Sequence, residues 1–240
     1  MPELQFLLIA GTAVFLGSLV QTGVGLGLGL VAAPVLVLLE PPLMPGALLT
    51  TTVVLPLLTV CTEWQHIDWR GLAWGLPARI PGAVAGAWLV TALEPRVLGA
   101  AVGVSVLLGV AASLWGHGPV RLTPALLVSA GTVAGITGTA TSIAGPPLAL
   151  LYQHQPAARV RATLGGFFLG GTLVSLLTLA AAGELTGRQL HHGLVLVPFV
   201  VAGFLLGRPV TRRLSTTGLR TSLLWVVSFS GIALIARSLL

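Results

Sequence analysis

The fold of this chain is decided by the stretch Gln21-Thr-Gly-Val-Gly-Leu-Gly-Leu-Gly29, which continues through apolar residues to Pro34. A second stretch of the same kind reads Gly135-Ile-Thr-Gly-Thr-Ala-Thr-Ser-Ile-Ala-Gly145 and ends in two prolines. Each lies inside a long apolar region, one in either half of the chain. Interrupted membrane helices at corresponding places in two halves are the best sequence pointer to a transporter's binding site.

The composition places the chain in a lipid bilayer. Hydrophobic residues make up 55% and charged residues 8%, whereas soluble domains carry about 25% charged residues. All 12 basic residues are arginines spread over short loops, so the net charge of +6 does not indicate nucleic-acid binding. The N-terminus, Met-Pro-Glu-Leu, lacks the positive region of a signal peptide, so we expect the first apolar run to remain in the mature protein.

Gly, Pro and Arg breaks divide the chain into ten apolar segments. The first, second, sixth and seventh are only 12 to 16 residues long and meet in pairs at the Gly motifs. A 15-residue helix rises about 22 Å, less than the ~30 Å hydrocarbon core, so we expect these segments to tilt, stop part-way or turn back. The segments are 5–20, 26–40, 45–62, 72–92, 97–115, 122–136, 142–153, 162–182, 190–207 and 219–239.

The two halves of the chain align with each other, which indicates an internal duplication. At an offset of 113 residues, Gly25 falls on Gly138 and Pro34 falls on Pro147. Farther along, the offset becomes 121, and further Gly and Pro residues match in order. We therefore expect a first transmembrane repeat at 1–118 and a second at 119–240, within one membrane domain. The broken helices lie at 5–40 and 122–153.

The distribution of arginines favours opposite orientations of the two repeats. With five segments per half, eight loop arginines lie on one side and only Arg96 and Arg188 on the other. The positive-inside rule places the eight in the cytoplasm. If each broken pair were a single crossing, the halves would be parallel and the count would be seven against three. The inverted arrangement is therefore preferred. The eight are Arg70, Arg121, Arg159, Arg161, Arg208, Arg212, Arg213 and Arg220.

The Gly motifs have the properties of an anion site built from backbone. Gly removes Cβ atoms, so backbone amides can approach a ligand or a neighbouring helix closely. A helix that begins after such a break points free N–H groups and the positive end of its dipole at the break. Tight helix packing explains any single Gly equally well, but for the paired breaks we expect a site. The candidate binding residues here are Gln21, Thr22, Gly23, Gly25, Thr137, Gly138, Thr139, Thr141, Ser142 and Gly145.

Arg79 is a further candidate, because it lies inside the fourth segment between Pro77 and Pro81. A charge within a span is costly and marks a functional site by default. Arg79 is either the countercharge for an anion or a side chain that snorkels to the cytoplasmic interface. Thr50 and Thr163 begin the spans that follow the broken pairs and complete the candidate site, although Thr in a span more often bonds to its own helix.

The sequence carries no sign of an enzyme, a metal or a cofactor. There is no His-Glu-x-x-His zinc helix and no Gly-x-Ser-x-Gly elbow, and a phosphate loop is excluded because Lys is absent. The single Cys61 excludes a disulfide framework and a thiolate metal site. An intramembrane serine dyad on Ser142 stays as a remote alternative, because no His is placed within a span.

In these residues the chain resembles the sulfite exporter TauE/SafE family of membrane permeases. The resemblance covers nearly the whole chain and rests on its size, the duplication, both Gly motifs, Arg161-Ala-Thr163 and Pro81-Gly-Ala-Val-Ala-Gly86. The second motif has Thr and Ala where many members carry more Gly. The resemblance implies a transporter for sulfur-containing anions such as sulfite, sulfonates or sulfoacetate, or for related organic anions.

We therefore expect an all-α, multi-pass membrane protein of two inverted repeats that moves such an anion by alternating access. We expect it in the plasma (inner) membrane of a bacterium, with a small anion and the lipid bilayer as its partners. The expectation includes no enzyme activity, no cofactor, no metal and no nucleic acid. Coupling to a proton or another ion and assembly as a homodimer stay open. An anion channel is the main alternative, and an intramembrane enzyme is a lesser one.

Overall fold

The computed structural model describes residues 3–114, 121–213, 228–229, 231–232 and 235–236. Within them the chain forms helices and no strand, which confirms the all-α membrane fold predicted from the composition. The segment at 219–239 lies largely outside the described residues, as does the boundary predicted at 118. The helices are α1 (Glu3–Val24), α2 (Leu28–Leu39), η1 (Pro41–Leu43), α3 (Gly46–Thr52), α4 (Val54–Glu63), η2 (Trp64–His66), α5 (Trp69–Ala92), α6 (Pro95–Leu114), α7 (Pro124–Thr141), α8 (Gly145–Tyr152), α9 (Ala157–Ala181), α10 (Gly187–Val195) and α11 (Val197–Arg213).

Both Gly motifs interrupt the helices, but later than the segment boundaries predicted from sequence. α1 has 22 residues and α7 has 18, so both helices extend into their motifs and are long enough to cross or nearly cross the bilayer. The short helices are the following ones, since α2 has 12 residues and α8 has eight. Apolar helices of this length do not span a membrane on their own, so they stop inside the protein.

Two spans are broken by proline rather than glycine. Pro56 cannot donate to the carbonyl of Thr52, and α3 gives way to α4 at Val53. Pro198 likewise cannot donate to Leu194, and α10 gives way to α11 at Leu196.

Four stretches in the described part of the chain are long and apolar enough to cross a membrane. α5 also has membrane-spanning length, with 24 residues, and it starts at Asp68, whose carboxylate accepts a hydrogen bond from Gly71 N. The four stretches are Glu3–Val24, Gly46–His66, Ala157–Ala181 and Gly187–Pro209.

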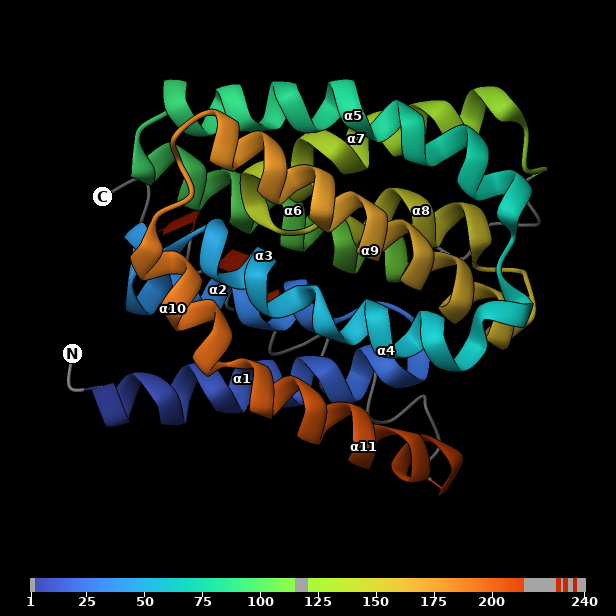
Figure 1. Cartoon of the computed structure of the whole chain (residues 1–240), viewed down its shortest axis with the longest axis horizontal. Coiled ribbons are helices and arrows are strands. Elements are labelled where there is room, and N and C mark those ends of the chain that lie inside the picture. Colours follow the sequence, from blue (N-terminus) through green and yellow to red (C-terminus); the bar gives the residue numbers. More distant parts are fainter. Residues whose placement is uncertain (1–2, 115–120, 214–227, 230, 233–234, 237–240) are drawn as a thin grey trace.

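The helices run side by side along the long axis of the molecule (Figure 1). α5 packs along α7 at one edge, and α1 packs along α11 at the opposite edge. Between these pairs, α3 contacts α10, and α9 contacts both α4 and α5. The short helices α2 and α8 each contact α6, so both are enclosed by other helices.

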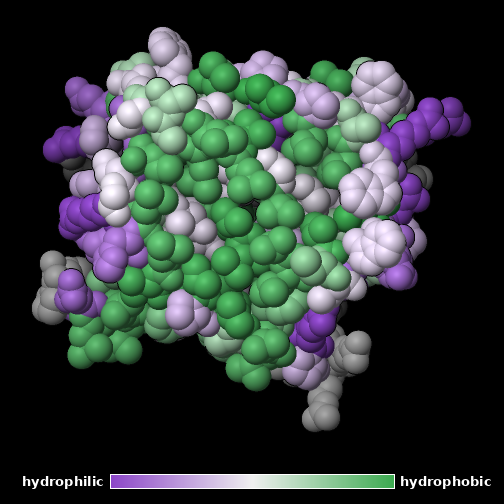
Figure 2. Space-filling view, viewed as in Figure 1, coloured by the Kyte–Doolittle hydropathy of each residue, from purple (hydrophilic) through white to green (hydrophobic). Residues whose placement is uncertain are grey.

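The surface has the distribution expected of a membrane protein. Figure 2 shows a broad apolar band across the middle of one face, with hydrophilic residues gathered at its two ends. Large apolar side chains such as Leu8, Val84, Leu108 and Leu177 are exposed on the helices. In water such a surface would be unfavourable, whereas in a bilayer it meets lipid tails.

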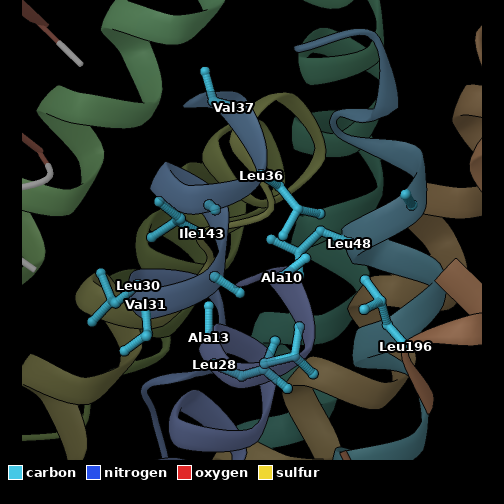
Figure 3. Packing of buried hydrophobic residues seen from close by; sticks show 14 of the residues in the cluster. Ala10, Ala13, Leu28, Leu30, Val31, Leu36, Val37, Leu48, Ile143 and Leu196 are labelled. Atoms are coloured by element: carbon cyan, nitrogen blue, oxygen red, sulfur yellow. The ribbon is translucent and has the colours of Figure 1, made fainter. Parts of the chain in front are cut away.

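The main core forms around α2, whose Leu28 and Leu36 are fully buried. Figure 3 shows these side chains gathered with Ala10 of α1 and Leu48 of α3, with Ile143 of the α7–α8 connection close by. Small residues on α1 allow α2 to approach it closely: a Cβ atom on Gly17 would lie 2.8 Å from the Cα of Leu28. This packing holds the first turn of α2 in the interior.

Candidate functional site

The two helix breaks meet inside the protein. A Cβ atom on Gly29 would lie 2.6 Å from the carbonyl oxygen of Ser142, so the first turn of α2 packs directly on the break between α7 and α8. A Cβ atom on Gly145 would lie 3.3 Å from Leu26 Cδ1, which joins the start of α8 to the other break. The tertiary structure thus brings together two motifs that are far apart in the sequence.

A cavity of about 40 Å³ lies at this junction, and residues of eight helices and both breaks line it. Among the described residues that line it, Arg79 is the only one with a formal charge, and none is a His, Cys, Asp or Glu. The lining residues are Gln21, Leu26, Gly27, Gly29, Leu30, Leu49, Thr52, Pro56, Arg79, Gly138, Ser142, Ile143, Ala144, Gly145, Phe168 and Thr172.

The breaks depend on backbone conformations that few residues adopt. Gly25 has φ 92° and Gly27 has φ 156°, so the chain turns between α1 and α2 through values that glycine alone adopts easily. Ser142 ends α7 with φ 61° and is the one described non-glycine residue with positive φ. Its hydroxyl donates to the carbonyl of Pro45 at the start of α3, 3.2 Å away, which ties the second break to the N-terminal half of the chain.

Both short helices begin at the cavity, and their first turns face it with the positive ends of their dipoles. At α2, the N–H of Leu28 donates to Gln21 Oε1 at 3.0 Å, while Gly29 and Leu30 line the cavity. At α8, Gly145 is followed by two prolines that have no N–H. The amide donors are therefore concentrated at α2 and at the residues immediately before Pro146.

Arg79 supplies the charge of the site. Its side chain is 1% exposed, so it does not snorkel to an interface. The atoms Nε and Nη1 are buried and make no hydrogen bond to any described residue. Two glycines make room for the guanidinium: a Cβ atom on Gly138 would lie 2.7 Å from Nη2, and one on Gly171 would overlap Cζ and Nε. The cation is thus held in a slot between α7 and α9.

None of the ion pairs among the described residues includes Arg79. Asp68 pairs with Arg159 at 3.3 Å, Glu63 pairs with Arg161 at 3.0 Å, and Glu40 pairs with Arg188. The first two pairs join α9 to the α4–α5 connection, where Tyr152 also donates to Asp68 Oδ2 at 3.1 Å. The third joins the end of α2 to the start of α10. These pairs lie away from the cavity, which leaves its cation without a protein countercharge in the described chain.

The structure brings five of the sequence-predicted site residues to the cavity: Gln21, Arg79, Gly138, Ser142 and Gly145. The others lie elsewhere. The hydroxyls of Thr22, Thr50, Thr137 and Thr141 each donate to a carbonyl four residues earlier. Thr139 shares a 2.7 Å hydrogen bond with Ser175, and Thr163 accepts one from the N–H of Asp68 at 2.9 Å. Gly25 packs against Arg161, and Gly23 is half-buried without lining the cavity.

Sequence reasoning missed several lining residues. Gly27 and Gly29 belong to the first motif, and their places within its Gly series were the available signal. Thr52 and Thr172 lie in the spans after the broken pairs, where the prediction chose Thr50 and Thr163 instead. For Thr172 the signal was the Gly170-Gly171-Thr172 triplet in the middle of a span, which allows close approach by another helix.

The arrangement is suited to binding rather than to covalent chemistry. It combines a buried cation, backbone amides and hydroxyls in a small space, all of which attract an anion. No group of three or more His, Cys, Asp or Glu residues that would hold a metal occurs in the part of the chain that the structure describes.

The chain has relatives among known proteins. The family model described as "Sulfite exporter TauE/SafE" matches residues 9–234. A protein of Cupriavidus necator described as "Probable sulfite/organosulfonate exporter TauE" is 32% identical over 210 residues, which cover 80% of this chain and 79% of the relative. A Comamonas testosteroni protein described as "Probable inner membrane transporter protein TsaS" is 24% identical over 177 residues, which cover 72% and 74%. No solved structure matches this chain.

The family match, over residues 9–234, includes both helix breaks and every described residue that lines the cavity. The family and both relatives are transporters and not enzymes. The chain is therefore a membrane transport protein that belongs to the sulfite exporter TauE/SafE family.

Proposed function

We propose that this protein is a secondary transporter that carries a small sulfur-containing or organic anion, such as sulfite, a sulfonate or sulfoacetate, across the bacterial inner membrane. The observation that carries the proposal is the buried guanidinium of Arg79, with two unpaired N–H-bearing atoms beside a cavity. Buried polar groups almost always have partners, and an unpaired buried ion costs several kcal/mol. An anion in the cavity would supply the missing partner.

The surroundings of the cavity reinforce the preference for an anion. The N-terminal turns of α2 and α8 add partial positive charge, and no carboxylate lines the space. Phe168 and Leu49 contribute apolar walls that lower the local dielectric constant and strengthen the attraction. Arg79 and the helix N-termini would repel a cation here.

The volume of the cavity favours a small substrate. One water needs roughly 10–15 Å³ of such space, so about 40 Å³ accommodates about three waters or a compact oxyanion. The Cupriavidus necator relative is described as an exporter of sulfite and organosulfonates. Sulfite is the compact member of that set, and an organosulfonate would require the site to open further.

The packing of the helices supports the proposal of two inverted repeats, at 1–118 and 119–240. In the proposed repeat, α1 corresponds to α7, and α5 corresponds to α10 together with α11. When the two halves are swapped, the contact of α1 with α11 becomes the contact of α7 with α5, and both contacts occur. In the same way, α3 corresponds to the start of α9, so the contact of α3 with α10 becomes the contact of α9 with α5. In both halves, the break joins a long helix to a short one. Such a pseudo-two-fold relation would put a shared site between the two proposed repeats.

Alternating access would require each end of the protein to open in turn. The pairs Glu63–Arg161 and Asp68–Arg159 lie at the start of α9, and the pair Glu40–Arg188 lies at the start of α10. In Figure 1 the starts of α9 and α10 lie at opposite ends of the bundle. Ion pairs at both ends can close one side while the other opens. We propose this mechanism in preference to a channel.

The test is transport by purified protein in proteoliposomes. We expect saturable uptake of labelled sulfite, together with counterflow from preloaded vesicles. Arg79→Met should abolish uptake, whereas Arg96→Gln, at an exposed arginine, should leave it unchanged. Unitary currents without counterflow would instead establish a channel, and full uptake by the Arg79 variant would refute the proposed site.

A further inference from the structure

Thr172 is exceptional among the membrane-helix threonines whose side chains the structure describes. Thr22, Thr59 and Thr178 illustrate the usual arrangement, in which the hydroxyl donates to the carbonyl four residues earlier at 2.8 to 3.0 Å. For Thr172 that acceptor would be the carbonyl of Phe168. The hydroxyl makes no hydrogen bond to Phe168 or to any other residue that the structure describes, although the residue is only 5% exposed.

The residue is largely buried, yet its hydroxyl oxygen is not one of the fully enclosed unpaired atoms of the described chain, so the oxygen keeps access to the cavity instead of bonding to its own helix. Transfer of a hydroxyl out of water without a compensating bond is unfavourable, and nearly all buried side-chain polar atoms in proteins are paired. The position of Thr172 suggests the reason for the exception, because Thr172 lines the cavity. Its hydroxyl is available to a ligand there.

Thr172 also shares its location with the cation of the site. It directly follows Gly171, the glycine that packs against the guanidinium of Arg79. Consecutive residues on a helix point in directions about 100° apart, so α9 presents a slot for the cation and a hydroxyl beside it. One short piece of backbone thus sets the relative positions of a positive charge and a neutral donor.

We propose that Thr172 is a specificity-determining ligand of the transported anion, whose hydroxyl donates to one oxygen while Arg79 binds the others. This inference rests on the proposed function and deepens it. An anion with several oxygens can use both donors at once, whereas a halide offers a single centre to the cation. Thr172 therefore favours an oxyanion over a halide, and it does so without adding charge to the interior.

The experiment compares sulfite and chloride binding by detergent-purified full-length protein, using calorimetric titration with a thermal-shift check. The variant Thr172→Val keeps the shape of the side chain and removes the hydroxyl, and Thr172→Ser keeps the hydroxyl. Thr178→Val is the matched control on the same helix, because its hydroxyl returns to its own backbone. We expect Thr172→Val to weaken sulfite binding at least ten-fold and to change chloride binding less than three-fold.

The two remaining variants should bind sulfite within three-fold of the wild type. Equal losses for sulfite and chloride in Thr172→Val would show a packing role and overturn the inference. Wild-type sulfite affinity in Thr172→Val would also overturn the inference. If Arg79→Met loses sulfite binding in the same experiment, the proposed function stands even though the inference about Thr172 fails. If the wild-type protein itself binds no sulfite, the proposed function fails and this inference fails with it.

Discussion

Gly171 of α9 lies against the guanidinium of Arg79 in α5 so closely that a Cβ atom at Gly171 would overlap the Cζ and Nε atoms. Gly138 of α7 approaches the same group from another helix. A bulky, branched cation therefore fits between two membrane helices only because both lack side chains at these points. The geometry of the anion site depends on two residues that have no polar side chain of their own.

Substitution of Gly171 by Ala should damage the site more than the fold. The added methyl group must displace the guanidinium, and overpacking of this kind costs about 1–3 kcal/mol. We expect sulfite affinity, measured by calorimetric titration, to fall at least ten-fold, which corresponds to about 1.4 kcal/mol. Gly187→Ala is the control, because no atom lies within 4 Å of the added group. Unchanged affinity in Gly171→Ala would show that the guanidinium is not part of the site.

Substitution of Arg79 by Met should separate stability from function. Replacing buried ions by apolar side chains of similar volume is often neutral or stabilising, and Arg79 has no protein countercharge among the described residues. We expect the unfolding temperature of Arg79→Met without anion to equal or exceed that of the wild type. Sulfite should raise the unfolding temperature of the wild type alone, because a ligand stabilises the state that binds it. A large loss of stability in the anion-free variant would instead indicate a structural role for Arg79.

Ser142 offers a test of the second helix break. A β-branched residue is unfavourable at φ 61°, so Ser142→Val should cost about 1–3 kcal/mol of stability and lower both expression and sulfite transport. Ser142→Gly relieves this conformation but removes the hydrogen bond to Pro45, so we expect a change within about 1 kcal/mol. The measurement is thermal unfolding in detergent. Equal stability of the Val and Gly variants would contradict the importance of this left-handed position.

The pair Glu63–Arg161 should contribute to closure at the start of α9. Both Nε and Nη2 of Arg161 donate to Glu63 Oε1, at 3.2 and 3.0 Å, and both side chains are about three-quarters buried. A double-mutant cycle with Glu63→Gln and Arg161→Gln, measured by thermal unfolding, should give a coupling energy of about 1 kcal/mol after allowance for solvent screening. The cycle formed by Glu63 and the exposed Arg96 is the control and should show no coupling. Coupling near zero in the first cycle would exclude a closing role.

Much of the fold was predictable from the sequence because it depends on local chemistry. Apolar runs gave the helices, and the Gly series located the two breaks, although α1 and α7 extend several residues beyond the predicted ends. These ends were misjudged because a Gly within a helix is tolerated when neighbouring helices pack against it. The helix stops only where positive φ is required, at Gly25 and at Ser142.

The site was less predictable, since the hydroxyl of a Thr in a membrane helix can donate a hydrogen bond to a carbonyl in the preceding turn of its own helix. Thr139 and Thr172 look equivalent in the sequence, yet Thr139 bonds to Ser175, while Thr172 lines the cavity and its hydroxyl bonds to no residue that the structure describes. No sequence pattern distinguishes them, because the distinction depends on which face of the helix meets a neighbour.

By itself, the sequence determined that this protein is a membrane protein and that two Gly-broken regions interrupt its helices, because hydrophobicity and backbone freedom are properties of the residues. Only the tertiary structure decided that the breaks meet and that Arg79 lies there without a carboxylate partner among the described residues. Three carboxylates pair with other arginines, and this allocation depends on how helices distant in sequence pack together. Charge pairing and cavity shape arise from that packing, so they appear only in the folded chain.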